Sequence, residues 1–434
     1  MGLGLRIEHV HAWEALDSRG VPTVACVVVL DGGAEGVATV PSGASTGSHE
    51  AHELRDGGTR YAGQGVRKAV AAVNGEIARA IRSVDPADQE AIDRQLRELD
   101  GTPTLERLGA NAVLAASVAC ALAAAAGRGL PLWRALEPDR PPLLPLPMVN
   151  ILSGGAHAGR AVDIQDVLVV PLGAASFGEA MEFAARVRAA TAEVMREAGH
   201  DSSLVADEGG LAARLPSNRD AVALVAAGIE RSGLVPGEQA AIAVDVAATA
   251  LLDGVVYRLA AEGRSVRSEE LVAEVREWCD AFPIVSVEDV VGEDDSSGWR
   301  LASETLADVQ LLGDDLFVTS AERVEAGIRD GVANAVLVKP NQVGTLSDAR
   351  RVVELARSAG YATVLSARSG ETEDAWLADL AVGWRTGQLK VGSTTRAERT
   401  TKWNRLLRIE AEYPDAVFAL GGPPLRATTL GGEV

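Results

Sequence analysis

The stretch AVLVKPNQVGT, residues 335–345, is a short apolar run of strand type that ends in Lys339 and breaks at once into proline, asparagine and glutamine. A lysine at the end of a buried strand loses hydration unless the protein needs its amine there. Taken alone, the pattern favours a side chain that reaches toward solvent. Other apolar runs of the chain also end in charged residues, and this shared feature favours a role for Lys339 in a common site.

The second half of the chain alternates strand-like apolar runs with amphipathic helical segments, which predicts βα units and a parallel sheet. Six runs are clear: IAVDVA near 242, IVSVED near 284, VQLLGDD near 309, AVLVK near 335, ATVLSAR near 362 and QLKVGS near 388. Residues 146–151 and 164–171 add two more candidates. We therefore predict an α/β fold with a closed eight-stranded βα (TIM-like) barrel.

The carboxyl ends of parallel barrel strands meet at one mouth, so the charged residues that end these runs converge there. Asp245, Glu288 and Asp314 are three of them. Each carboxylate could be a helix cap. Three hard oxygen ligands around one axis would repel one another without a divalent cation, and this favours a Mg²⁺ site.

Two lysines, Lys339 and Lys390, would lie across the mouth near that cation. Nearby positive charge and partial burial depress a lysine pKa, so Lys339 is the candidate general base. Glu208, in the motif DEGG, is the candidate acid on the opposite side. Arg368 and Ser369 offer the donors that a phosphate group needs.

The N-terminal part has a different pattern. Residues 6–29 alternate and turn at DSRGVPTV, which predicts an antiparallel sheet; residues 66–82 and 109–127 are helical in pattern, and the proline-rich residues 138–145 are a linker. We predict an N-terminal α+β capping or lid domain at 1–138 and the barrel at 139–434.

The segment SGASTG, residues 42–47, is too small and polar to form a core. It is either a flexible surface loop or a lid that closes over a ligand and offers hydroxyls and amides. The segment alone does not separate these two interpretations.

Composition narrows the class of protein. The chain has 434 residues, 47% of them hydrophobic, three cysteines without metal-type spacing and a formal charge of −20. We expect a cytoplasmic protein with no signal peptide, no disulfide framework and no uncharged apolar run as long as a membrane span. The negative charge argues against nucleic acid or membrane as partner, and an anionic substrate would need metal ions or a basic cluster at its site.

Long ordered motifs resemble the enolase family (phosphopyruvate hydratase) from residue 5 to about residue 412. They are DSRGVPTV, VPSGASTG with HEAHELRDG, GANAVLAAS, LPLPMVN with GGAHA, DEGG, DVAA, VEDVVGEDD, GDDLFVTS, VKPNQVGTLSD, RSGETEDAWLADLAVG, GQLKVGS and RTTKWNRLLRIEAE. The resemblance implies an enolase-type barrel whose second strand is antiparallel, two Mg²⁺ sites per subunit, and a homodimer or homo-octamer. It also implies reversible dehydration of 2-phosphoglycerate, a small anionic phosphorylated substrate, to phosphoenolpyruvate through an enolate.

The resemblance also assigns roles to positions of this chain. Lys339 matches the base and Glu208 the acid. The match to metal ligands covers Asp245, Glu288 and Asp314, with Ser45 for a second metal, which favours the lid interpretation of SGASTG. Substrate-binding positions are matched by Gln165, His157, Asp166, Arg368, Ser369 and Lys390.

Several positions depart from the family pattern, and they gather around the expected substrate. Ala367 stands where the family has histidine, and Asp166 stands where it has glutamate. Val21, Ser153 and Pro340 replace two asparagines and a valine. These changes leave open an enolase-like enzyme of phosphonate metabolism similar to carboxyphosphonoenolpyruvate synthase. A non-catalytic surface-binding protein, with a secondary place at the cell surface, is a weaker alternative. So is a racemase or sugar-acid dehydratase.

Overall fold

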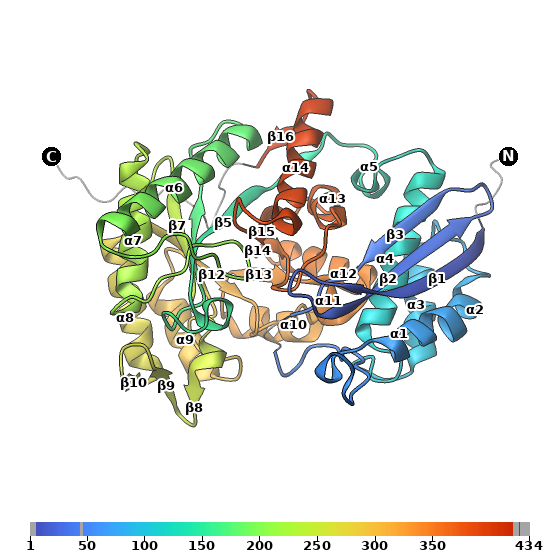
Figure 1. Cartoon of the computed structure of the whole chain (residues 1–434), viewed down its shortest axis with the longest axis horizontal. Coiled ribbons are helices and arrows are strands. Elements are labelled where there is room, and N and C mark those ends of the chain that lie inside the picture. Colours follow the sequence, from blue (N-terminus) through green and yellow to red (C-terminus); the bar gives the residue numbers. More distant parts are fainter. Residues whose placement is uncertain (1–5, 44–46, 420–424, 426–434) are drawn as a thin grey trace.

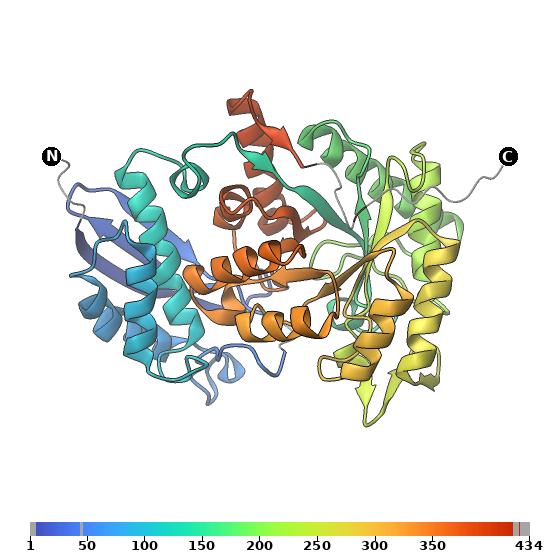
Figure 2. The same cartoon turned by 180° about the vertical axis from the view of Figure 1, so that it is seen from behind.

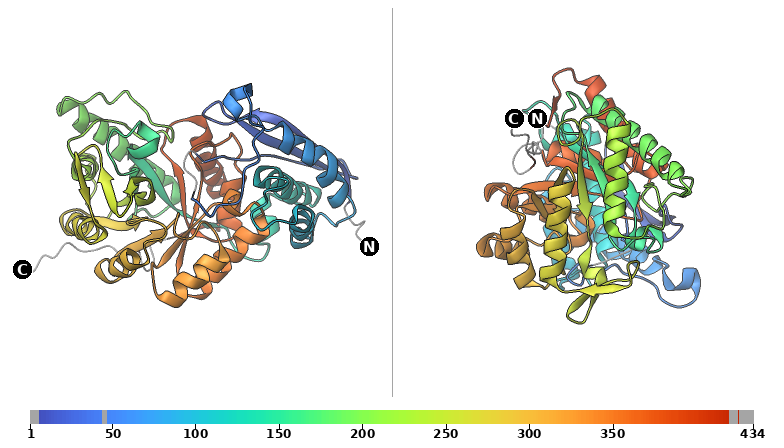
Figure 3. Two further views of the ribbon diagram at one scale, coloured as in Figure 1. Left: turned by 90° about the horizontal axis from the view of Figure 1, so that it is seen from below. Right: turned by 90° about the vertical axis from the view of Figure 1, so that its left-hand side faces the viewer.

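The computed structural model describes residues 6–43, 47–419 and 425. Two parts lie side by side along the long axis: a barrel with surrounding helices, and a smaller part built on a three-stranded sheet (Figures 1 and 2). The view from below shows the sheet and its helices gathered at one end of the molecule (Figure 3).

The smaller part is an antiparallel sheet, β1-β2-β3, covered by helices. Its strands are β1 (Ile7–Leu16), β2 (Pro22–Leu30) and β3 (Glu35–Thr39). The helices are η1 (Arg60–Gly63), the continuous run α1 (Arg67–Ala72), η2 (Val73–Ile77) and α2 (Ala78–Ile81), then α3 (Gln89–Asp100), α4 (Ala110–Gly127) and α5 (Leu132–Leu136). The sheet and the two predicted helices are confirmed, whereas β3, α3 and α5 were missed.

Helix α4 is 18 residues long and uncharged, so by length and composition it could cross a membrane. The expectation that no apolar run reaches that length is therefore wrong. Within the structure 83% of this helix is buried, and it packs on β2 and β3. At Gly36 a Cβ atom would overlap the helix backbone at Ala119 and Ala123, so glycine allows the close approach. Alanine-rich α4 is thus the core helix of the smaller part.

The barrel is closed in the order β11-β12-β13-β14-β15-β5-β6-β7. Its second strand in chain order, β6, runs antiparallel to both neighbours, and the other pairs are parallel. The predicted eight strands and the reversed second strand are confirmed. The strands are β5 (Leu146–Ser153), β6 (Asp166–Val170), β7 (Ala241–Asp245), β11 (Ile284–Glu288), β12 (Gln310–Gly313), β13 (Ala335–Val338), β14 (Ala362–Ser366) and β15 (Gly387–Gly392).

The reversal of β6 affects the mouth of the barrel. Because β6 runs backwards, its first residue, Asp166, lies beside the last residue of β7, Asp245. Gln165 and Asp166 therefore reach the same mouth as the carboxyl ends of the other strands.

Helices surround the barrel, and many begin at the caps that their sequences offer. Ser176, Ser217, Ser320 and Thr345 each accept a backbone N–H in the first turn of the helix that follows. The helices are α6 (Phe177–Glu197), α7 (Asn218–Arg231), α8 (Ser268–Ala281), α9 (Ser296–Thr305), α10 (Ala321–Asp330), α11 (Pro340–Val343), α12 (Leu346–Ser358), α13 (Trp376–Gly383) and α14 (Ala397–Glu412).

Minor elements complete the fold. A small sheet is formed by β8 (Leu252–Asp253), β9 (Val256–Leu259) and β10 (Arg264–Val266), and single turns of 3-10 helix are η3 (Gly155–Ala158) and η4 (Ala248–Leu251). The predicted linker contains β4 (Leu143–Leu144), which pairs with β16 (Val417–Phe418).

Candidate active site

Lys339 follows β13 and precedes Pro340, the first residue of α11. Proline at this helix position fixes the backbone and gives up only an N–H that the helix would leave unpaired. The Lys339 N–H donates to Oγ1 of Thr319 at 2.9 Å, and its Nζ forms an ion pair with Asp314. The predicted base and one predicted metal ligand are therefore in contact.

Lys390, on β15, lies between two strand-end carboxylates. Its Nζ is 2.8 Å from Oδ2 of Asp245 and 2.7 Å from Oε2 of Glu288. The Nε2 of Gln165 donates to the same Asp245 oxygen at 3.1 Å. The mouth thus brings together charged groups from three strands and the neutral amide of the residue before β6.

The electrostatics of the mouth are strongly coupled. Burial and the neighbouring Asp245 raise the pKa of Glu288 well above its ordinary value. Burial acts to lower the pKa of Lys339, but the carboxylates of Asp314 and Glu288 act together against it, and the pKa lies above its ordinary value. The predicted depression of the Lys339 pKa supposes a cation beside the lysine and stays a prediction; here the lysine is bound to a carboxylate, which raises its pKa.

The predicted metal ligands suit a hard cation. Asp245, Glu288 and Asp314 are buried carboxylates at neighbouring strand ends. Oε1 of Glu288 is buried and has no hydrogen-bond partner among the described residues, so this oxygen is available to a cation. These oxygen donors fit Mg²⁺.

A second cluster of carboxylates shares Asp314 with these three residues. The carboxylates of Asp289, Asp314 and Asp315 come within 4.8 Å of one another. Asp289 accepts the backbone N–H groups of Asp314 and Asp315, at 3.0 and 2.8 Å. We interpret Asp289 as the residue that holds the end of β12 in place.

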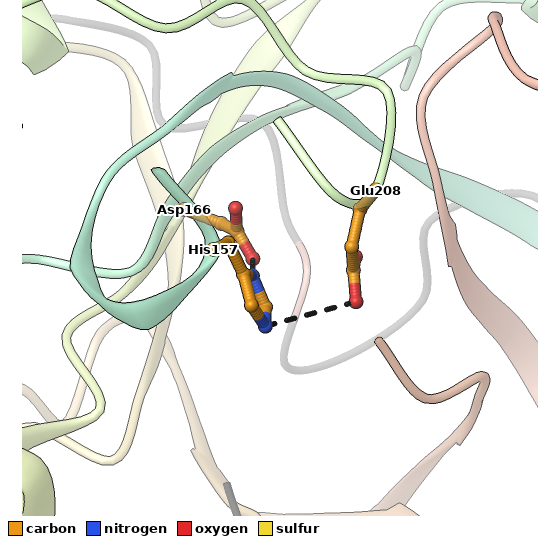
Figure 4. Close-up of side chains that lie close together, drawn as sticks. All are labelled: His157, Asp166 and Glu208. Carbon is orange, nitrogen blue, oxygen red and sulfur yellow. Dashed lines mark hydrogen bonds and ion pairs between the residues drawn. The ribbon is translucent and has the colours of Figure 1, made fainter. Parts of the chain in front are cut away.

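Across the mouth, His157 lies between Asp166 and Glu208 (Figure 4). Its Nδ1 is 3.2 Å from Oδ2 of Asp166, and its Nε2 is 4.0 Å from Oε1 of Glu208. Burial acts to lower the pKa of His157, but the two carboxylates outweigh it and raise that pKa to about 9. Burial acts to raise the pKa of Glu208, and the positive charges of Arg399 and His157 outweigh it, so that pKa is lowered. At neutral pH the pair therefore holds one proton, on His157.

The predicted phosphate-binding residues follow β14. Nη1 of Arg368 is 2.8 Å from a carboxylate oxygen of Glu50, and Oγ of Ser369 accepts from Arg19 at 3.4 Å. The carbonyls of Arg368 and Ser369 accept hydrogen bonds from Arg399. Ser45, the predicted ligand of a second metal, lies outside the described residues.

Several residues of the site were missed at the level of sequence. Asn150 donates to Asp166 at 2.5 Å, and Gln342 donates to Asp314 at 3.0 Å. Glu50 and Arg399 contact predicted site residues directly. Gln342 could have been predicted from the sequence, because it lies three residues after Lys339 on a helix of one turn.

A closed barrel with one reversed strand, with buried carboxylates and lysines gathered at its mouth, defines the class: an α/β-barrel enzyme equipped for acid–base chemistry. Two family models that match the chain identify the family within this class of enzyme. The model described as the enolase C-terminal TIM barrel domain matches residues 141–423, and that of the enolase N-terminal domain matches residues 7–136.

Curated relatives agree with the family models. The chain is 48% identical to the enolase of Sulfurimonas denitrificans over 407 residues, covering 94% of this chain and 96% of that protein. It is 47% identical to enolase 2 of Pseudomonas syringae pv. tomato and to enolase 2 of P. syringae pv. syringae, in each case over 96% of this chain and 98% of the relative. The chain belongs to the enolase family, and the predicted enolase-type fold is confirmed.

Proposed function

We propose that this chain is a Mg²⁺-dependent hydro-lyase that converts 2-phosphoglycerate to phosphoenolpyruvate and back, the enolase step of glycolysis. Relatives named enolase match nearly its whole length. The observation that carries the proposal is the division of the mouth into two sides. On one side, lysines form ion pairs with carboxylates. On the other side, His157 carries a proton close to Glu208.

The metal would be held by Asp245, Glu288 and Asp314, whose oxygens now bind Lys339 and Lys390. Bound there, Mg²⁺ would supply positive charge that stabilises an enolate, which has two negative charges at its carboxylate end. The family as a whole depends on this ion. A second Mg²⁺ per subunit, with Ser45 as a ligand, is part of the proposal.

In the forward direction Lys339 takes the proton from the carbon next to the substrate carboxylate. For this its amine must be neutral, so the lysine must first lose the Asp314 carboxylate that keeps it charged. The C–O bond on the adjacent carbon then breaks with its electron pair going to oxygen, and the carboxyl group of Glu208 donates the proton that turns the leaving hydroxide into water. Protonated His157, held in place by Asp166, supplies that proton to Glu208.

The remaining predicted residues bind and orient the substrate. Arg368 and Ser369 would hold the phosphate group, and Lys390 and Gln165 the carboxylate end. The positive charges of Arg368 and Lys390 give an anion a local site on a chain whose net charge is −20. We also retain as predictions a domain boundary at residue 138, a homodimer or homo-octamer, and a cytoplasmic location.

The direct test is phosphoenolpyruvate formation from 2-phosphoglycerate with Mg²⁺, followed by absorbance. In Lys339→Ala we expect both dehydration and exchange of the carbon-bound proton to fall by at least about a hundredfold, the scale of general base catalysis. Mg²⁺ binding, measured by calorimetry, should persist. Proton exchange at the wild-type rate in this variant would contradict the role of Lys339.

A further inference from the structure

The carboxylate of Glu50 contacts Arg368, the predicted phosphate-binding arginine. Its Oε2 is 2.8 Å from Nη1 of Arg368, and its Oε1 is 3.3 Å from Nη2 of the same guanidinium. The two side chains are only 8% and 3% exposed. Two parallel contacts in a poorly hydrated place fix the plane of a guanidinium as well as its position.

The same carboxylate also reaches the polypeptide segments on either side. Oε1 of Glu50 accepts the backbone N–H of Gly47 at 2.9 Å and Nε2 of Gln342 at 3.4 Å. The Gln342 amide also donates to the predicted metal ligand Asp314 at 3.0 Å. One side chain thus joins the N-terminal segment, the arginine and the helix that follows the base.

The backbone at Gly47 is packed tightly against the barrel. A Cβ atom there would lie 2.7 Å from a methyl group of Val318, so a side chain at this position would have to displace Val318. The hydrogen bond to Glu50 therefore joins a closely packed backbone position to Arg368.

We propose that Glu50 is a positioning residue for the substrate phosphate: it sets the plane of Arg368 and holds that plane in register with the backbone at Gly47. This inference rests on the proposed function, because the phosphate belongs to the substrate. Glu50 lies beyond the arginine and acts through it. Its loss should weaken substrate binding more than it slows the chemical step.

The experiment compares Glu50→Gln with a matched control from the same segment. Glu53 pairs with Arg55 and accepts from Ser42. Its charge acts on Arg368, but no hydrogen bond or ion pair described here joins the two, so Glu53→Gln removes a nearby charge without removing a contact. We expect Glu50→Gln to raise KM for 2-phosphoglycerate by at least about tenfold, the lower range for breaking a buried charge pair, with kcat changed less than about threefold. Glu53→Gln should change KM by less than about threefold, and Glu50→Asp, which keeps the charge, should recover part of the loss.

A double-mutant cycle tests the route of the effect. If Glu50 acts through Arg368, adding Glu50→Gln to Arg368→Lys should raise KM little beyond Arg368→Lys alone. Multiplying effects would overturn the proposal, as would a Glu50→Gln enzyme whose kcat and melting temperature fall while KM stays unchanged. Should Glu50→Gln not fold, the cycle is run with Glu50→Asp.

The proposed function and this inference can fail separately. A wild-type protein without turnover of 2-phosphoglycerate contradicts the function. Calorimetry with inorganic phosphate then tests Glu50 alone, with wild type, Glu50→Gln and Glu53→Gln compared. Weaker phosphate binding only in Glu50→Gln supports the positioning role, and equal binding in all three overturns it.

Discussion

At the scale of single residues, Lys339 and Lys390 offset the charge of three carboxylates at the barrel mouth in part. Each forms an ion pair with buried carboxylates, and burial of these charges is tolerated only because they are paired. The arrangement explains why the pKa of Lys339 is raised although a base needs a free amine. The lysine acts as a counter-ion in this state, and its work as a base depends on what else binds Asp314.

Replacing Ala367 is the most direct test of how the site protonates the leaving hydroxide. Ala367 is buried beside Lys390, whose carbonyl accepts its N–H at 2.9 Å, and it precedes Arg368, whose own carbonyl binds Arg399 near Glu208. An imidazole here would add a proton carrier close to the acid. We expect Ala367→His to raise kcat for 2-phosphoglycerate up to about tenfold in steady-state assays, a modest share of what acid–base groups contribute.

The control for this change is Ala367→Asn, which adds a polar group of related size but carries no exchangeable charge near neutral pH. A gain in both variants would point to packing rather than proton transfer. A loss in Ala367→His would mean that the space beside Ala367 serves the substrate of this enzyme as it stands.

At the scale of elements, the parts of the site that follow from chain order could be predicted. Asp245 and Lys339 end apolar runs, and a barrel sends all such ends to one mouth. Glu50 could not be found in this way, because its partner Arg368 is more than three hundred residues away and no periodicity links them. Asn150 could not be found either: it lies within a buried strand, and its contact with Asp166 depends on the register of the reversed β6.

The contact between α3 and α12 makes a prediction about pH. Asp93 on α3 accepts both the N–H and the hydroxyl of Ser347, in the first turn of α12, at 2.8 and 2.6 Å. Burial raises the Asp93 pKa from 3.8 to about 6, although these hydrogen bonds lower it. The folded state then binds more protons than the unfolded state between pH 3.8 and about 6, so the free energy of unfolding falls as pH rises through that window.

Two pKa units correspond to about 3 kcal/mol, so the effect should be measurable. Relative to wild type, Asp93→Asn should gain stability in thermal melts as pH rises from 4 to 6, and the difference should level off above that. Glu90→Gln, exposed on the same helix, is the control. A constant difference between Asp93→Asn and wild type across this range would contradict the assignment.

At the scale of the whole molecule, the stretch that contains the base also joins the two parts of the chain. Gly344 has a φ of +81°, and a Cβ atom there would overlap Leu105 and crowd Ala110 of the N-terminal part. Gly344 lies five positions after the proposed base, so a tight contact between the smaller part and the barrel lies close to that base along the chain. The barrel was predictable from strand ends, whereas this contact was not, because glycine in a sequence does not reveal what lies against it.

The carboxylates at the mouth should make the stability of the whole chain depend on Mg²⁺. A ligand that binds only the folded state stabilises it by about 3 kcal/mol at a hundred times its Kd, which should raise the melting temperature by a few degrees. Glu288→Gln should lose most of this shift, because it removes a buried carboxylate whose Oε1 has no partner among the described residues. Glu269→Gln, exposed on α8, should keep it. Because the pKa of Glu288 is raised, protons compete with the ion, so the shift should shrink as pH falls. Scanning calorimetry with chelator and with added Mg²⁺ measures all three proteins, and an equal shift in Glu288→Gln and wild type would exclude Glu288 as a ligand.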